Sequence, residues 1–292
     1  MLYGGRILGL EKICGDGVVE KFTSECPGIL EAPNFDKEGN LWLISARGPG
    51  AILRVTPDGH CSIVAKVPDG TVGLRFHKDG RLFGADHYRG LFWFDTKTHE
   101  VHHVTSGYAP GNFHGIDDLF FDSTGGLYIT DAFGSSVLNP VGQLFYMAPT
   151  GELRRLIHQG LAFPNGVVLS PDEKRLYIDD WGTNRILAVP VTSPGVVNID
   201  RAYVFAYLNG GHGPDSMTAD AEGNIYAAHF GAGEVVVFDP NGFYYGGIQL
   251  PTGLYPTNVA FHGGYLYITE VEHHTIWRVK TKIPGMKLFG DG

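Results

Sequence analysis

Residues 162–178 read AFPNGVVLSPDEKRLYI: a carboxamide, an apolar run, a charged turn, and a second apolar run that carries an aromatic residue. The strand, turn and aromatic strand of this stretch recur along the whole chain. The six copies span residues 34–44, 74–83, 119–129, 168–178, 218–227 and 259–268. A unit repeated at this scale is the signature of a repeat architecture, and it decides the fold before any other feature does.

The aromatic residue of the second run sets the period of the repeat. In chain order it is Trp42, Phe83, Tyr128, Tyr177, Tyr226 and Tyr267, at spacings of 41, 45, 49, 49 and 41 residues. Such a period is typical of propeller blades, each of which is a four-stranded antiparallel sheet. No stretch of ten or more residues has a clear helical period. The sequence therefore predicts an all-β, six-bladed β-propeller.

The ring of blades has to be closed, and the two ends of the chain suggest how. Residues 17–22 (GVVEKF) are strand-like and precede the first copy, whereas the sixth unit ends near Thr281 with little room for a fourth strand. We expect the N-terminal strand to complete the last blade, which protects an otherwise open sheet edge. Residues 1–292 are then expected to form a single propeller domain without a linker.

Composition agrees with this architecture and narrows the possible partners. The 292 residues are 43% hydrophobic and 18% charged, as in a soluble globular protein with a large core. The 42 glycines and 17 prolines suit short strands joined by tight turns. A formal net charge of -9 argues against a nucleic-acid partner. No run approaches the roughly 20 apolar residues that cross a bilayer, so we expect no membrane association.

The cysteines bear on the cellular compartment. Cys14, Cys26 and Cys61 are odd in number and lack metal-ligand spacing. We expect them to form no disulfide framework, which favours a reducing compartment. The N-terminus also lacks a charged segment followed by a long apolar one, as a secretory signal would have. The prediction is a cytoplasmic protein that acts as a monomer or a small homo-oligomer.

One position in each repeat, five residues ahead of the turn, precedes the first strand. In the six copies it is Glu31, Val72, Asp117, Asn165, Asp215 and Thr257. Because blades pack their first strands around a central channel, these residues are expected at one height on the axis. Four of them are carboxylates or a carboxamide, and three carboxylates at one level would repel one another without a cation. For any single residue a turn cap is the alternative, since Asp and Asn often bond nearby backbone.

The candidate metal ligands are therefore Glu31, Asp117, Asn165 and Asp215. Hard oxygen ligands suit Ca²⁺, which we favour, as well as Mg²⁺ or Mn²⁺; Zn²⁺ is a further alternative. The second strand of each blade returns toward the same end of the channel, so its last residues are expected to wall a pocket. The candidate substrate-binding residues are Arg47, His87, His114, Phe133, Trp181, His229, Phe230 and Val271. A partly apolar mouth over a metal is a usual ligand site, although such residues can also simply cover the channel.

Three of these residues, His87, His114 and His229, are candidates for proton transfer or substrate orientation. The alternative for each is a plain hydrogen-bonding role, which is the commoner one for a lone histidine. Other nucleophile schemes find no support, because the chain has no Gly-x-Ser-x-Gly elbow, no His-Glu-x-x-His motif and no phosphate-binding glycine motif.

The chain resembles the regucalcin/gluconolactonase (senescence marker protein) family of six-bladed propeller hydrolases. The motifs that carry the resemblance lie at residues 30–33 (LEAP), 116–122 (IDDLFFD), 163–166 (FPNG) and 213–216 (GPDS). The resemblance covers essentially the whole chain. It implies hydrolysis of lactones or related esters, with one divalent cation held at positions 31, 117, 165 and 215.

The chain departs from the family pattern at three places. Asp117 stands where Asn is usual. Val271 follows Thr269-Glu270 where phosphatase-like members have His, which disfavours organophosphate hydrolysis. Gly115 stands where sugar-acid lactonases have Arg. These departures, together with the apolar rim, indicate a lactone or ester less polar than gluconolactone.

The resulting hypothesis is metal-assisted opening of a cyclic ester. The cation would polarise the carbonyl, with Asp215 as the base or the nucleophile. One alternative is a metal-dependent lyase or isomerase that uses the same pocket. The other is a calcium-binding propeller without catalytic activity.

Overall fold

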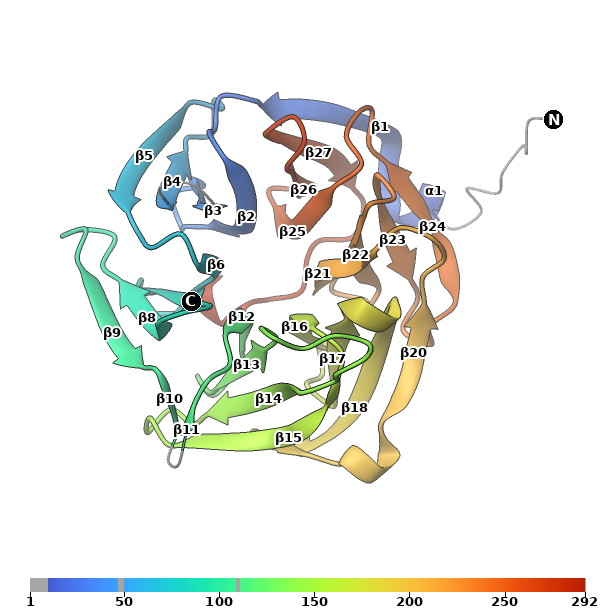
Figure 1. Ribbon diagram of the computed structural model, residues 1–292. Helices are drawn as coiled ribbons and strands as arrows, with labels where there is room; N and C mark the ends of the chain where they lie inside the picture. Colours follow the sequence, from blue (N-terminus) through green and yellow to red (C-terminus); the bar gives the residue numbers. More distant parts are fainter. Residues whose placement is uncertain (1–9, 47–49, 109–110, 292) are drawn as a thin grey trace.

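The computed structural model describes residues 10–46, 50–108 and 111–291 and shows six antiparallel sheets around a central channel (Figure 1). Blade one comprises β2 (Ile29–Phe35), β3 (Leu41–Ala46), β4 (Ala51–Val55) and β5 (Cys61–Lys66). Blade two comprises β6 (Thr71–Phe76), β7 (Leu82–Asp86), β8 (Gly90–Phe94) and β9 (Val101–Thr105). Blade three comprises β12 (Ile116–Phe121), β13 (Leu127–Asp131), β14 (Gly142–Met147) and β15 (Leu153–Leu161).

The second half of the ring repeats the arrangement. Blade four comprises β16 (Pro164–Leu169), β17 (Arg175–Asp180), β18 (Arg185–Ser193) and β20 (Tyr203–Tyr207), with the short β19 (Val196–Val197) also paired to β18. Blade five comprises β21 (Gly213–Ala219), β22 (Ile225–Phe230), β23 (Glu234–Phe238) and β24 (Tyr244–Gln249). Blade six comprises β25 (Pro256–His262), β26 (Tyr265–Glu270), β27 (Thr275–Thr281) and β1 (Cys14–Thr23).

Few elements stand outside the blades. A two-stranded hairpin, β10 (Gly107–Tyr108) and β11 (Gly111–Asn112), lies between blades two and three. The described helices are α1 (Leu10–Ile13), η1 (Trp181–Thr183), η2 (Ile199–Arg201) and η3 (Phe289–Asp291). None of them is long and apolar enough to cross a membrane. The prediction of an all-β propeller with six blades is confirmed.

The ring closes as predicted. Strand β1 pairs antiparallel with β27, with Val19 opposite Val279 and Glu20 opposite Arg278. The Arg278 Nε donates to the Glu20 Oε1 at 2.7 Å across this pairing. The last blade is thus built from both ends of the chain, and its outer edge is the N-terminal strand.

The prediction about the cysteines was wrong. Cys26, just after β1, and Cys61, at the start of β5, form a disulfide, whereas Cys14 is free and buried. The Cα atoms of the bonded pair are 5.5 Å apart although 35 residues separate them in sequence. Ring closure brings them together, because it lays the segment after β1 against the outer part of blade one.

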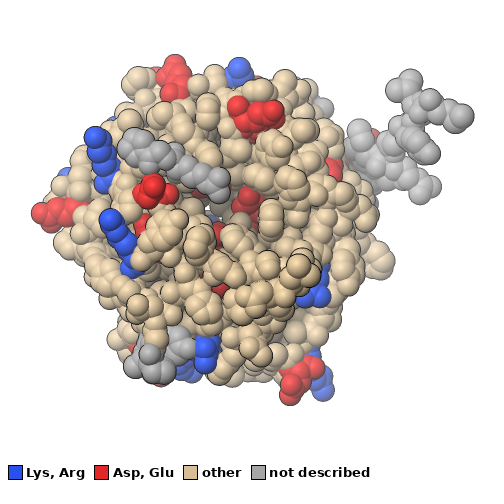
Figure 2. Space-filling model, in the orientation of Figure 1, with Lys and Arg blue, Asp and Glu red and all other residues tan. Residues whose placement is uncertain are grey.

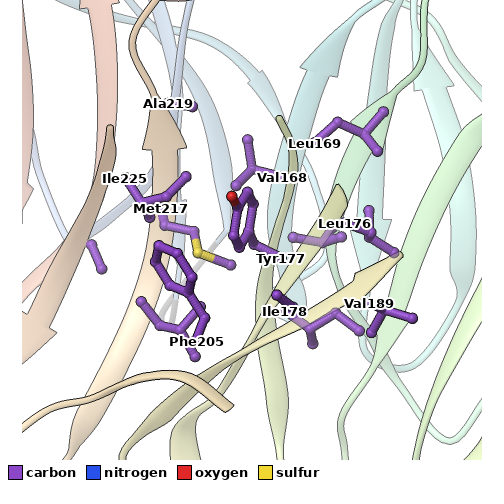
Figure 3. Packing of buried hydrophobic residues seen from close by; sticks show 14 of the residues in the cluster. Val168, Leu169, Leu176, Tyr177, Ile178, Val189, Phe205, Met217, Ala219 and Ile225 are labelled. Atoms are coloured by element: carbon purple, nitrogen blue, oxygen red, sulfur yellow. The ribbon is translucent and has the colours of Figure 1, made fainter. Parts of the chain in front are cut away.

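The repeated aromatic residue fills the space between neighbouring blades. In every blade this residue is buried, and Tyr128, Tyr177 and Tyr226 have no exposed surface. Figure 3 shows Tyr177 beside Phe205 and Met217, which come from different strands. Burying such large rings contributes strongly to folding, which explains why an aromatic recurs at this position.

The inner strands define two ends of the channel, which we call the site end and the far end. The inner strands start at the site end and run to the turns at the far end. The C-terminal strap, residues 284–291, crosses the far end of the ring (Figure 1). Its Met286 N donates to Ala219 O at 3.0 Å, and its Phe289 ring contacts His77 and Phe121 at centroid distances of 4.9 and 5.5 Å.

Candidate functional site

Each inner strand breaks its regular pairing at the position that the sequence singled out. The register shifts fall between Glu31 and Asn34, Thr71 and Gly73, Ile116 and Leu119, Pro164 and Val167, Pro214 and Met217, and Pro256 and Asn258. A β-bulge bends a strand and re-aims a side chain, and bulges are frequent beside active sites. Each blade thus has a β-bulge that points one side chain of its inner strand away from regular sheet geometry.

Three of the four candidate ligands come together at these bulges. Asn165 Nδ2, on β16, donates to Asp215 Oδ1, on β21, at 2.9 Å. Asp117, on β12, is close enough to raise the pKa of Asp215. Each of the three residues is 8% exposed. Figure 2 shows a hollow at the centre of one face of the molecule, with acidic side chains inside it.

The fourth candidate, Glu31, occupies the equivalent bulge on β2 and is half-buried. Its neighbour Ala32 has a left-handed backbone with φ 52°, a conformation that few non-glycine residues adopt. The bulge of blade one is therefore shaped differently from those of blades three to five. Glu31 shares their register but is more open to solvent than they are.

Burial dominates the electrostatics of the site. The pKa of Asp215 is raised well above its ordinary value, first by burial and then by Asp117, while the hydrogen bond from Asn165 opposes the shift. The pKa of Asp118 is raised to about 6 by burial, against the effect of Arg75. The pKa of Asp179 is likewise raised well above its ordinary value by burial and by Asp215. Several carboxylates thus share a poorly solvated space, where a cation would relieve their repulsion.

The donor set fits a hard divalent cation. Asp117 and Asp215 offer carboxylate oxygens and Asn165 offers an amide oxygen, the ligand type that Ca²⁺ and Mg²⁺ prefer. Within the part of the chain that the structure describes, no three His, Cys, Asp or Glu side chains form a group that could hold an ion as they stand. A coordination sphere made by the candidate ligands would therefore include the amide oxygen of Asn165.

One side of the hollow is formed around His87. Its Nε2 lies 2.9 Å from Asp117 Oδ2, so this predicted rim residue contacts a candidate ligand directly. The His87 ring contacts Phe133 at a centroid distance of 5.2 Å, and Tyr88 contacts Phe133 at 5.7 Å. Phe133 is 41% exposed, so an aromatic face is open to solvent near Asp117.

The other side is an aromatic arc over blades four to six, made of Phe163, Trp181, His212, Phe230 and Tyr255. Neighbouring rings in this arc have centroids between 4.9 and 6.3 Å apart. Trp181 and Phe230 were predicted at the rim, and half-buried Val271 joins the arc because its N donates to Tyr255 O at 3.2 Å. All three predicted residues lie on this side of the mouth.

Sequence reasoning missed three members of the aromatic arc. Phe163 lies two residues before Asn165, Tyr255 two before Thr257, and His212 three before Asp215. The signal that could have found them is this spacing, because a ring just ahead of an inner strand lies at the site end. His114, three residues before Asp117, is the predicted residue that shares this offset.

Two further predicted residues, His229 and His114, have their described side-chain contacts away from the candidate ligands. His229 is 1% exposed, and its Nε2 lies 3.0 Å from Gly210 O in the loop before β21, so its side chain is buried and its contact with substrate stays a prediction. Alternation along β22 turns its side chain inward and leaves the next residue, Phe230, for the mouth. His114 is exposed, with its Nε2 3.4 Å from Gln143 Nε2. Arg47 lies outside the described residues.

Comparison with known proteins places the chain in a family. The model of the SMP-30/gluconolactonase/LRE-like region matches residues 29–272. The lactonase Drp35 of Staphylococcus epidermidis is 34% identical over 231 residues, which cover 76% of this chain and 70% of that protein.

Solved structures show the same fold at lower identity. A gluconolactonase from Xanthomonas campestris has a TM-score of 0.81 at 23% identity, covering 93% of this chain and 92% of its own. A calcium-binding protein, regucalcin, from Agrobacterium tumefaciens has a TM-score of 0.78 at 23% identity, covering 93% and 96%. With the family model spanning most of the propeller, this chain is a member of the SMP-30/gluconolactonase/LRE-like family.

Proposed function

We propose that the protein is a divalent-metal-dependent hydrolase that opens a lactone. The observation that carries the proposal is the contact between Asn165 and Asp215 beside Asp117, buried at the bulges of three inner strands. The similarity to a protein named lactonase Drp35 supports the same reaction class. On this proposal residues 1–292 act as one propeller domain.

The metal would be held by Glu31, Asp117, Asn165 and Asp215. We favour Ca²⁺, because the ligands are oxygen atoms and one solved relative is described as calcium-binding. When bound, the cation would supply Lewis-acid polarisation of the ester carbonyl. Replacing the usual Asn by Asp117 adds one negative charge to the set, which should tighten cation binding.

The protein's own residues would orient the reaction. The Asn165 amide fixes Asp215 through a 2.9 Å hydrogen bond, so one carboxylate oxygen has a defined direction. Asp215 would then accept the proton of the attacking water or attack the carbonyl itself. His87 Nε2 lies 2.9 Å from Asp117 Oδ2 and would hold that carboxylate in place.

The mouth of the hollow indicates the kind of substrate. On one side of the mouth, the aromatic side chain of Phe133 is exposed to solvent. On the other side, over blades four to six, lies the aromatic arc of Phe163, Trp181, His212, Phe230 and Tyr255. Apolar walls around a few polar groups favour a ligand with apolar surface. We therefore propose a lactone or ester less polar than gluconolactone.

The test is an activity screen after removal of bound metal. The purified protein is treated with a chelator and assayed against sugar, aliphatic and aromatic lactones, with Ca²⁺, Mg²⁺, Mn²⁺ or Zn²⁺ added back separately. Hydrolysis that depends on one of these ions supports the proposal. Metal binding without turnover on any substrate would favour the non-catalytic propeller, and conversion without uptake of oxygen from labelled water would favour a lyase or isomerase.

We still propose a cytoplasmic location, but the cysteines no longer support it. It was inferred partly from the expectation that the cysteines are reduced, whereas Cys26 and Cys61 are bonded to each other. Titration of free thiols in the denatured protein, purified without reductant, checks this directly. One thiol per chain, from Cys14, is expected if the disulfide forms, and three thiols would restore the original inference.

A further inference from the structure

The six blades can be compared at one further position, two residues after the repeated aromatic. This position lies on the second strand of each blade, beside the bulge of the first. The six residues are Ile44, Ala85, Thr130, Asp179, Ala228 and Thr269. Asp179 is the one ionisable residue among them. Blade four therefore carries a carboxylate where the other blades have a small, apolar or hydroxyl side chain.

The Asp179 carboxylate binds the backbone of the Asn165 bulge. Its Oδ1 accepts from Asn165 N at 3.2 Å, and its Oδ2 accepts from Gly166 N at 2.7 Å. Asp179 has no exposed surface. A Cβ at Gly166 would collide with Asp179 Oδ2, so the approach of this carboxylate to the backbone requires a glycine there.

In two other blades, a threonine contacts the bulge with a single hydroxyl. Thr130 Oγ1 accepts from Asp118 N at 2.9 Å, and Thr269 Oγ1 donates to Asn258 O at 3.2 Å. Thr130 also donates to Asn165 O at 2.6 Å, across the gap between blades three and four. The backbone of Asn165 is thus held on both sides, by Thr130 at its carbonyl and by Asp179 at its N–H.

A carboxylate at this position destabilises the fold more than a hydroxyl does. Burying it beside the carboxylate of Asp215 costs folding free energy, whereas a threonine hydroxyl stabilises the bulges of blades three and six without a charge. The carboxylate, however, offers a separate oxygen to each of two consecutive N–H groups, Oδ1 to Asn165 and Oδ2 to Gly166, whereas a hydroxyl has a single oxygen atom. The additional constraint acts on the residue whose side chain holds Asp215.

We propose that Asp179 is a positioning residue, which fixes the Asn165–Gly166 bulge so that the Asn165 amide is held against Asp215 for cation binding. This inference rests on the proposed metal site. It assigns to Asp179 a role at that site that acts through Asn165 and involves no contact with substrate. Residues that orient metal ligands in this way typically change metal affinity by about 10- to 100-fold when they are replaced.

The test uses two variants of Asp179 and one matched control. Asp179→Thr installs the residue that blades three and six already accommodate, and Asp179→Asn keeps the shape but offers one acceptor oxygen. Thr269→Ala removes the equivalent contact in blade six, where the bulge residue is Thr257 and no ligand is proposed. Affinity for Ca²⁺, or for whichever cation the wild-type chain binds, is measured by calorimetry, and folding by circular dichroism and melting temperature.

Asp179→Thr is expected to bind the cation about 10- to 100-fold more weakly, with an unchanged or raised melting temperature. Asp179→Asn should recover part of the affinity, since it retains one of the two contacts, and Thr269→Ala should bind as tightly as the wild type. In lactone hydrolysis at saturating metal, Asp179→Thr should lower kcat more than it raises KM.

Three results would overturn the inference. If Asp179→Thr and Asp179→Asn both bind the cation with wild-type affinity, Asp179 does not position the ligand set. An equal loss in Thr269→Ala would show a general effect on strand pairing. A wild-type chain that binds no divalent cation would contradict the proposed function itself and the inference with it, whereas the first two results leave the metal site intact.

Discussion

The two ends of the central channel have opposite physical characters. At the site end, Asp117, Asp179 and Asp215 are buried together, and burial raises the pKa of both Asp179 and Asp215. At the far end, the C-terminal strap lays Met286 and Phe289 over the channel. Apolar contact at the far end thus stabilises the folded state, whereas the buried carboxylates at the site end destabilise it.

The far end retains space as well as packing. A cavity of about 350 Å³ lies between the strap and the ends of the inner strands, and it is lined by aromatic rings such as Phe35, Phe120 and Phe261. The strap therefore covers the channel without filling it. One repeat can supply both ends of the channel, because the bulge at the start of an inner strand and the packing at its end are separate features.

The largest effect is expected at the site end, from Asp215→Asn. This variant should lose turnover by about 100- to 10,000-fold, since the proposed base or nucleophile is removed while the shape is kept. Its melting temperature should stay the same or rise, because one buried carboxylate is gone. Steady-state kinetics and a thermal melt measure the two quantities. Wild-type turnover in this variant would rule out the role proposed for Asp215.

Removal of bound metal should affect the site end and leave the packing of the far end unchanged, without any mutation. After chelation, activity should fall to background and return when the cognate cation is restored, and the metal should raise the melting temperature by mass action. A cation at 100 times its Kd stabilises the folded state by about 2.7 kcal/mol. Activity that survives exhaustive chelation, verified by elemental analysis, would contradict metal dependence.

At the far end, Met286→Ala should affect stability alone. Met286 is buried in the cluster that includes Leu169 and Ala219, and truncating such a side chain costs about 2 kcal/mol or more. Urea unfolding measures the loss, and kinetics well below the melting temperature should match the wild type. A change in KM would show that the strap communicates with the site end.

The smallest effect is expected from Asp79→Asn, in the far-end turn between β6 and β7. Burial raises the pKa of Asp79, but hydrogen bonds from Arg81 and His77 outweigh it and lower the pKa to about 2. Because this value is below the ordinary 3.8, the carboxylate stabilises the fold above pH 3.8, and the contribution is lost as the pH falls through 2.

The Asp79 side chain is 43% exposed, so solvent screening limits its contribution to less than about 1 kcal/mol. Urea unfolding of wild type and variant should therefore differ slightly at pH 7 and should converge as the pH approaches 2. A constant difference across that range would show that the contact does not depend on the charge of Asp79.

The blade count, the closure and the register of the candidate ligands could be predicted from the sequence. The blade count and the register follow from periodicity, an aromatic every 41 to 49 residues and a fixed five-residue offset from each turn. The closure follows from a strand-like segment ahead of the first copy and a last unit with little room for a fourth strand. The pattern marked Tyr177 as the repeated aromatic and Asn165 as a channel position, and the structure shows the first buried and the second at a β-bulge. The remaining prediction, that these ligands hold a metal, is a matter for the experiments above.

Features that depend on contact between blades could not be predicted in this way. The disulfide between Cys26 and Cys61 exists because ring closure brings β1 against blade one, and a count of cysteines contains no such information. His229 is buried because of the direction that its side chain takes in β22. The role proposed for Asp179 follows only from its hydrogen bonds with the N–H groups of Asn165 and Gly166. Distances between repeats are set by how the ring packs, and a repeat read in isolation cannot supply them.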